Sequence, residues 1–132
     1  MAPRTAKQFQ DIREEKKTLI MDVALEHFAS EGYHKSTISH IARHAGISKG
    51  LMYNYFKSKE ELLEEIISRS MGEISHYFDP DKDGYLSEEE FELFVRKYFL
   101  IVRNNLSFWR LYYQLLQQKD APRWRKACMP RR

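Results

Sequence analysis

The sequence is poor in the features that mark secreted and membrane proteins. One cysteine, Cys128, excludes an internal disulfide framework. No apolar run approaches the roughly 18 residues needed to span a membrane, and the longest such run covers only residues 99–102. The N-terminal stretch MAPRTAKQFQ lacks the apolar core of a signal peptide. These absences favour a cytoplasmic protein without a membrane partner.

The sequence also lacks an alternating strand pattern, an internal repeat and a nucleophile–base pair. Its acidic residues lie mainly at expected helix starts and in one loop. We therefore expect an all-α protein that is not an enzyme. At 132 residues, 42% hydrophobic and 31% charged, the chain has the composition of a folded protein and the length of one compact domain or two very small ones.

The net charge of +3 is unevenly distributed. Residues 1–59 carry 10 basic and 6 acidic side chains (+4), residues 60–120 carry 7 and 13 (−6), and residues 121–132 carry 5 and 0 (+5). The basic front segment suits a polyanion, although +4 over this length is also ordinary. Residues 121–132 lose helical periodicity, and we interpret them as a basic, disordered tail.

Apolar residues at steps of three and four predict a succession of helices. Gly32 and Gly46 are expected to end the first two helices, and serine or threonine precedes each later one. Ser58 and Glu61 form a capping-box pattern at the fourth start. The expected helices cover about residues 11–30, 38–45, 49–55, 59–77, 88–103 and 107–118.

The second and third helices are separated by about three residues around Gly46. This spacing is that of a helix-turn-helix, whose second helix enters the major groove of DNA. The third helix carries no acidic residue, which DNA phosphates would repel. The stretch STISHIARHAGISKGLMYNYFKSKEELL, residues 36–63, resembles the DNA-binding head of the TetR family, and the resemblance extends over about residues 15–65.

The resemblance implies a sequence-specific regulator that binds double-stranded DNA, most often as a repressor. It implies a three-helix head at 11–60, then a long connecting helix and a partial helical regulatory domain at 61–120. Family members dimerise and bind a small-molecule inducer through the regulatory domain. Because about two helices follow the connecting helix, we expect a truncated chain, an exposed apolar patch within 91–116 and uncertain dimerisation.

The resemblance also implies roles for individual residues. Those expected to contact phosphate or the DNA backbone are Thr37, Tyr53, Tyr55 and Lys59. Those expected nearest the bases are Ser48, Lys49, Gly50 and Asn54, and an asparagine side chain can pair with adenine. Taken singly, each has a structural alternative: a threonine caps a helix, a tyrosine packs, and a lysine is solvated.

A second motif, DPDKDGYLSEEE at residues 79–90, follows the calcium-loop pattern of an EF-hand. The pattern places oxygen ligands at loop positions 1, 3, 5, 7 and 12 and glycine at position 6. The expected calcium ligands are Asp79, Asp81, Asp83, the Tyr85 carbonyl and Glu90, with Gly84 at position 6. No cofactor is required by the DNA-binding interpretation, and calcium is the possible ion.

The same loop has a second explanation that needs no metal. Ser87 and Glu90 form a capping box, and Asp-Pro and Asp-Gly pairs favour turns. EF-hands also usually work in pairs, and this chain has one such loop. Elsewhere, His40 and His44 have the spacing of zinc ligands, but no third ligand lies near them in sequence, so a solvated helix face is the simpler interpretation.

Overall fold

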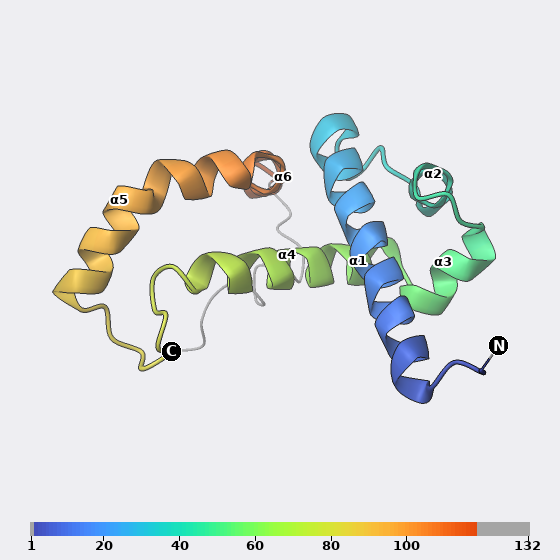
Figure 1. Cartoon of the computed structure of the whole chain (residues 1–132). Coiled ribbons are helices and arrows are strands. Elements are labelled where there is room, and N and C mark those ends of the chain that lie inside the picture. Colours follow the sequence, from blue (N-terminus) through green and yellow to red (C-terminus); the bar gives the residue numbers. More distant parts are fainter. Residues whose placement is uncertain (1, 119–132) are drawn as a thin grey trace. The chain divides into compact units, whose positions relative to one another are not determined.

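The computed structural model describes residues 2–118, and every regular element in that range is a helix (Figure 1). The all-α prediction is confirmed. The expected tail at 121–132, including Cys128, lies outside the described residues. The helices are α1 (Ala6–Glu31), α2 (Ile38–His44), α3 (Lys49–Tyr55), α4 (Lys59–Ser75), α5 (Glu88–Asn104) and α6 (Leu106–Leu116).

Helix α1 begins five residues before the expected start because the chain carries an unrecognised capping box. The Thr5 hydroxyl accepts a hydrogen bond from the Gln8 N–H at 3.2 Å, and the Gln8 side chain accepts one from the Thr5 N–H at 2.8 Å. The helix ends at Gly32, whose φ of 91° suits glycine better than any other residue. The Gly32 N–H donates to the Phe28 carbonyl and closes the last turn.

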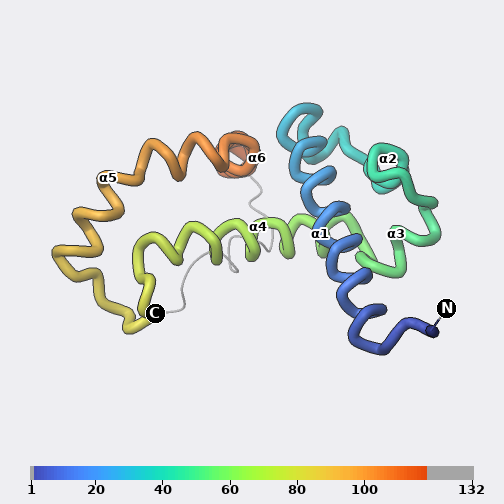
Figure 2. Tube along the Cα trace, viewed as in Figure 1, coloured from blue at the N-terminus to red at the C-terminus, as the bar shows by residue number. Residues whose placement is uncertain are grey.

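The chain divides into two units, Met1–Leu62 and Leu63–Arg132, and the boundary falls near the start of α4. We call the first unit the head. In the head, α2 packs against both α1 and α3 (Figure 2). Its core consists of side chains that are at most 2% exposed: Ile20, Ala24, Phe28, Ile41, Ala42, Met52, Phe56 and Leu62.

The start of α4 differs in one detail from the expected capping box. Ser58 Oγ accepts the Glu61 N–H at 3.1 Å, as expected. The Glu61 carboxylate, however, accepts the N–H of Lys57 at 2.7 Å instead of that of Ser58. The helix is therefore capped, but the reciprocal hydrogen bond lies one residue further upstream.

The second unit contains most of α4, an acidic loop, α5 and α6. Helix α5 starts with a capping box between Ser87 and Glu90, and α5 packs against α6. At their junction, the Asn105 amide donates to the Ile101 carbonyl at 2.8 Å. The expected apolar exposure within 91–116 is observed, with Phe91 55%, Phe99 81% and Tyr113 64% exposed.

Among the described residues, none of the helices combines the length and the apolar character that crossing a membrane requires.

Candidate functional site

The turn between α2 and α3 is a complete Schellman motif. The Ile47 N–H donates to the Ala42 carbonyl at 3.0 Å, and the Gly46 N–H donates to the Arg43 carbonyl at 3.1 Å. Gly46 has a φ of 70°, the left-handed conformation that this motif needs at its central position. The motif ends α2 sharply and fixes the direction in which α3 leaves. The predicted helix-turn-helix is thus formed by local backbone bonding.

Thr37 and Ser48 occupy equivalent positions at the starts of the two helices. Thr37 Oγ1 accepts the His40 N–H at 3.2 Å, and Ser48 Oγ accepts the Leu51 N–H at 3.0 Å. Both residues are exposed. A capping hydroxyl uses its oxygen as acceptor and keeps its own hydrogen for another partner. Each residue therefore combines the capping role with the ability to donate to an external oxygen.

Helix α3 has one buried side and one exposed side. Met52, at 0% exposed, fixes the buried side, and the next residue after the helix, Phe56, is also 0% exposed. The exposed side carries the residues predicted to read bases or contact the DNA backbone: Lys49, Gly50, Tyr53 and Asn54. This face has donors, acceptors and a positive charge but no carboxylate, which matches the chemistry of a DNA groove.

Tyr55 is only half-exposed, because Arg13 of α1 lies across it. The Arg13 guanidinium carbon lies 4.7 Å from the centre of the Tyr55 ring, within cation–π range. The same guanidinium donates to the Asn54 carbonyl at 3.0 Å, near the end of α3. Arg13 thereby ties α1 to the end of the recognition helix. Sequence reasoning missed this contact, since the two segments are 41 residues apart.

Lys59 has a structural role that the sequence did not reveal. Its ammonium donates to the Tyr33 carbonyl at 2.9 Å and the Ser36 carbonyl at 3.2 Å, and it lies 4.3 Å from the centre of the Tyr33 ring. These bonds tie the start of α4 to the turn that precedes α2. An ammonium has three donors, so one N–H is left for the phosphate contact that the sequence predicts.

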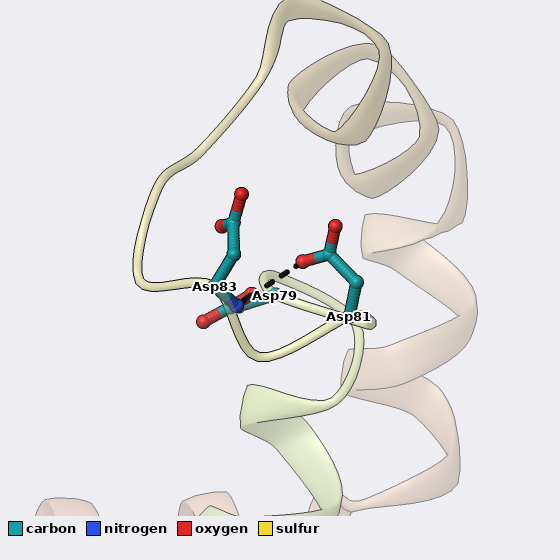
Figure 3. A group of neighbouring side chains, drawn as sticks. All are labelled: Asp79, Asp81 and Asp83. Atoms are coloured by element: carbon teal, nitrogen blue, oxygen red, sulfur yellow. Dashed lines mark hydrogen bonds between the residues drawn. The ribbon is translucent and has the colours of Figure 1, made fainter.

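The acidic loop brings three of the five predicted calcium ligands together. Asp79, Asp81 and Asp83 place one carboxylate oxygen each within 4.8 Å of one another, the one such group found among the described residues (Figure 3). The dashed line in Figure 3 marks the bond from the Asp83 N–H to Asp81, at 3.2 Å. Gly84, at loop position 6, has the positive φ of 82° that the pattern requires.

The aspartates are already bonded to the loop backbone. Asp79 accepts the N–H groups of Asp83 and Gly84 at 3.0 and 3.1 Å, and Asp83 accepts the Tyr85 N–H at 2.8 Å. The bond from the Asp83 N–H lowers the pKa of Asp81, but desolvation and the neighbouring carboxylates outweigh it and raise the pKa above its ordinary value of 3.8. Part of the increase comes from repulsion by the carboxylates of Asp83 and Glu90.

Glu90 is not part of the group of three aspartates in the structure, and its role as a calcium ligand stays a prediction. Its carboxylate accepts the Ser87 N–H at 2.8 Å, while the Ser87 hydroxyl accepts the Glu90 N–H at 3.2 Å. The capping box holds Glu90 because its partner is local, only three residues away. Tyr85 is 78% exposed, and the ligand role of its carbonyl stays a prediction.

Comparison with known proteins finds that the part of the chain containing the helix-turn-helix is similar to bacterial regulators. Residues 20–66 match the family described as "Bacterial regulatory proteins, tetR family". The chain is 36% identical over 84 residues to the fatty acid metabolism regulator protein of Bacillus subtilis (strain 168), covering 63% of this chain and 43% of that protein. It is 39% identical over 67 residues to the HTH-type transcriptional repressor KstR2 of Mycolicibacterium smegmatis (strain ATCC 700084 / mc(2)155), covering 51% and 31%.

Solved structures agree with the observed fold. A transcriptional regulator (TerR/AcrR family) from Aquifex aeolicus VF5 superposes with a TM-score of 0.58 at 33% identity, covering 76% of this chain and 54% of that one. A TetR-family regulator from Haemophilus influenzae Rd has a TM-score of 0.67 at 21% identity, covering 89% and 64%, and supports the fold alone. The chain spans less than two thirds of the length of each of these four relatives.

Proposed function

We propose, on the premise that residues 20–66 belong to the tetR family of bacterial regulatory proteins, that this chain binds duplex DNA and represses transcription. The observation that carries the proposal is the exposed, acid-free face of α3, presented by a complete Schellman turn after α2. The matched family is described as bacterial regulatory proteins, and we propose that this chain is likewise a regulator and not an enzyme. A regulator of this kind acts on DNA in the cytoplasm.

In this proposal the exposed polar side chains divide into two groups. Thr37, Tyr53, Tyr55 and Lys59 bind the phosphate backbone and set the position of the head on the duplex. Ser48, Lys49 and Asn54 lie at base edges, where lysine suits guanine and the asparagine amide suits adenine. Tyr53, 45% exposed, is better placed for an intermolecular contact than Tyr55, which lies beneath Arg13.

Gly50 supports close approach of α3 to DNA. It lies within the helix with no positive φ, and a Cβ added there would meet nothing within 4 Å. The fold therefore gives no internal reason for a glycine, although glycine is the poorest helix former after proline. A glycine at this position lets a partner approach the backbone closely. We infer that the partner is the groove wall.

Palindromic operators require two heads, so we propose that two copies of the chain bind one operator. The exposed apolar residues of α5 and α6 in the second unit are the candidates for joining them. An inducer, if the whole protein binds one, would act through that unit.

The direct test is selection of bound duplexes from a random library, followed by affinity measurements by fluorescence anisotropy. We expect a preferred sequence to emerge.

Asn54→Ala should relax the preference at one position of that sequence and cost about 1–3 kcal/mol of binding free energy. Tyr53→Phe should weaken binding to all sequences alike. As a matched control, Tyr113→Phe changes an exposed tyrosine of α6 and should leave affinity unchanged. Enrichment of no sequence would contradict the proposal.

A second candidate function is calcium binding by the loop at 79–90, favoured by the three gathered aspartates and by Gly84 at position 6. A single loop of this kind is expected to bind in the roughly 10⁻⁴–10⁻³ M range. In calorimetry with magnesium as competitor, Asp79→Ala should abolish the calcium heat, whereas Glu88→Ala should preserve it. Glu90→Ala should weaken binding only if calcium draws Glu90 out of its capping box. Absence of heat at millimolar calcium would leave the loop as a capped turn.

A further inference from the structure

Three of the five histidines gather where α1 meets α2, in the head. The ring centre of His27, from α1, lies 5.2 Å from that of His44 and 6.2 Å from that of His40, both from α2. His40 and His44 are one helical turn apart and are exposed. In the sequence, His40 and His44 have the spacing of metal ligands, but no third ligand lies near them. The packing of α1 on α2 supplies the third imidazole, 13 residues before His40 in the chain.

His27 carries an unused nitrogen. Its Nε2 atom is buried and has no hydrogen-bond partner. A buried polar atom without a partner is costly and rare in folded proteins, so this one calls for an external partner. A neutral imidazole nitrogen without another partner is a suitable metal ligand.

The spacing of two of the three rings, those of His27 and His44, fits a shared metal ion. With zinc–nitrogen distances of about 2.0–2.1 Å and tetrahedral angles, the centres of two bound imidazoles lie about 5 Å apart. The His27–His44 separation has this value. In the structure the ring nitrogens of His27, His40 and His44 do not all lie within 4.8 Å of one another. Among the described residues, the three aspartates of the loop are the one group whose ligand atoms lie that close together. Rotation of the exposed His40 and His44 rings about their side-chain bonds is therefore part of binding.

A hollow of about 330 Å³ surrounds these rings and has room for an ion and water. It is lined by His27, Glu31, Lys35, His40, Arg43 and His44. Glu31 provides a carboxylate that offsets the charge of a cation. Lys35 and Arg43 act in the opposite direction and lower the affinity. Imidazole nitrogen selects zinc, nickel or copper over calcium or magnesium, which prefer oxygen.

We propose that His27, His40 and His44 bind one zinc-class transition-metal ion across the interface of α1 and α2, with water or Glu31 in the fourth position. The ion joins the first helix of the head to the first helix of the helix-turn-helix. It therefore holds α2 in its packed position and stabilises the head. The proposal does not depend on DNA binding.

The test is a titration with cobalt, whose tetrahedral complexes absorb visible light, followed by displacement with zinc. It is made in a Cys128→Ser background, so that the thiol is not a ligand. We expect one equivalent to saturate the absorption, and His27→Gln, His40→Gln and His44→Gln each to weaken binding by roughly tenfold or more. His34→Gln and His76→Gln, the other two histidines, are matched controls and should bind as the parent does.

Circular dichroism of each variant, recorded without metal, separates loss of a ligand from loss of folding. If His27→Gln loses helix content, the metal affinity of His44→Gln is the test, because His44 is exposed and its replacement should leave the fold intact. Zinc should also raise the unfolding temperature of the parent and not that of His44→Gln. The proposal is overturned if no cobalt binds at 100-fold excess, if His44→Gln binds as tightly as the parent, or if the control variants lose binding equally.

Discussion

The two units of this chain are both helical, but they use their apolar residues differently. In the head, Phe28, Met52 and Phe56 are all 0% exposed. In the second unit, α5 has 17 residues, of which only Ile101 is buried. Both units have well-formed caps, such as Thr5 in the head and Ser87 in the second unit. Local signals thus form helices in both units, and both bury large apolar side chains, such as Phe108 and Leu111 of α6 in the second unit. The difference is that the second unit, and α5 above all, also exposes many more large apolar side chains than the head does.

This difference separates two kinds of function. The head has a fixed geometry, and it needs this geometry in order to present α3 to a DNA groove. The second unit offers exposed apolar side chains, which suit contact with another surface. The predictions below test this contrast from the largest expected effect to the smallest.

Removing a buried phenylalanine of the head should destabilise the chain far more than removing an exposed phenylalanine of α5. Phe56→Ala should lower the free energy of unfolding by about 3–5 kcal/mol, because it leaves a cavity in the core. Phe99→Ala, at a position 81% exposed in α5, should change it by no more than about 0.5 kcal/mol. Urea denaturation followed by circular dichroism measures both. Comparable losses would show that the contrast in packing is wrong.

Replacing Lys59 tests its role as an internal tether. Lys59→Met removes two charged hydrogen bonds to backbone carbonyls and should cost about 1.5–3 kcal/mol of unfolding free energy. Lys57→Met, two residues away and exposed, is the control and should cost no more than about 0.5 kcal/mol. If the two variants are equally stable, the tether contributes nothing and Lys59 is purely a surface residue.

The glycines at 46 and 72 should respond in opposite directions to the same change. Gly46→Ala forces alanine into the left-handed conformation and should cost about 1–2 kcal/mol. Gly72→Ala lies within α4 in open space without a positive φ, and should stabilise the chain by up to about 1 kcal/mol. Thermal denaturation distinguishes the signs. A stable Gly46→Ala variant would argue against the Schellman turn.

Removing equivalent caps should have local effects in the head and wider effects in the second unit. Thr5→Ala and Ser87→Ala each should cost about 1 kcal/mol of helix stability. In α1 the core holds the later turns, so only the first turns should exchange amide hydrogens faster. In α5, which has a single buried residue, protection should fall along most of the helix. The reverse pattern would mean that α5 is the better anchored helix.

The sequence predicted what depends on neighbouring residues. Gly46 marked the turn because a left-handed residue after α2 is a local requirement, and Thr37 and Ser48 marked the caps for the same reason. The tether of Lys59 was not predictable, since its partners Tyr33 and Ser36 become neighbours only when α4 packs.

One further case shows the same limit. His27 became a neighbour of His40 and His44 only through the packing of α1 on α2. Glu90 shows a different limit, because two local patterns, a calcium loop and a capping box, share this residue and the sequence does not rank them. In the structure Glu90 accepts a hydrogen bond from the Ser87 N–H and so forms the capping box, while its role as a calcium ligand stays a prediction.

The most direct test of the central claim, that α3 lies against DNA, is the affinity of Gly50→Ala for the selected duplex, measured by fluorescence anisotropy over a range of salt. Gly50→Ala should fold at least as stably as the parent, because the added Cβ meets nothing in the chain. The account predicts that it binds DNA at least roughly tenfold more weakly, since the methyl group occupies space that the groove wall needs, while Gly72→Ala keeps the parent's affinity and salt dependence. Equal affinity of Gly50→Ala and the parent would contradict the account.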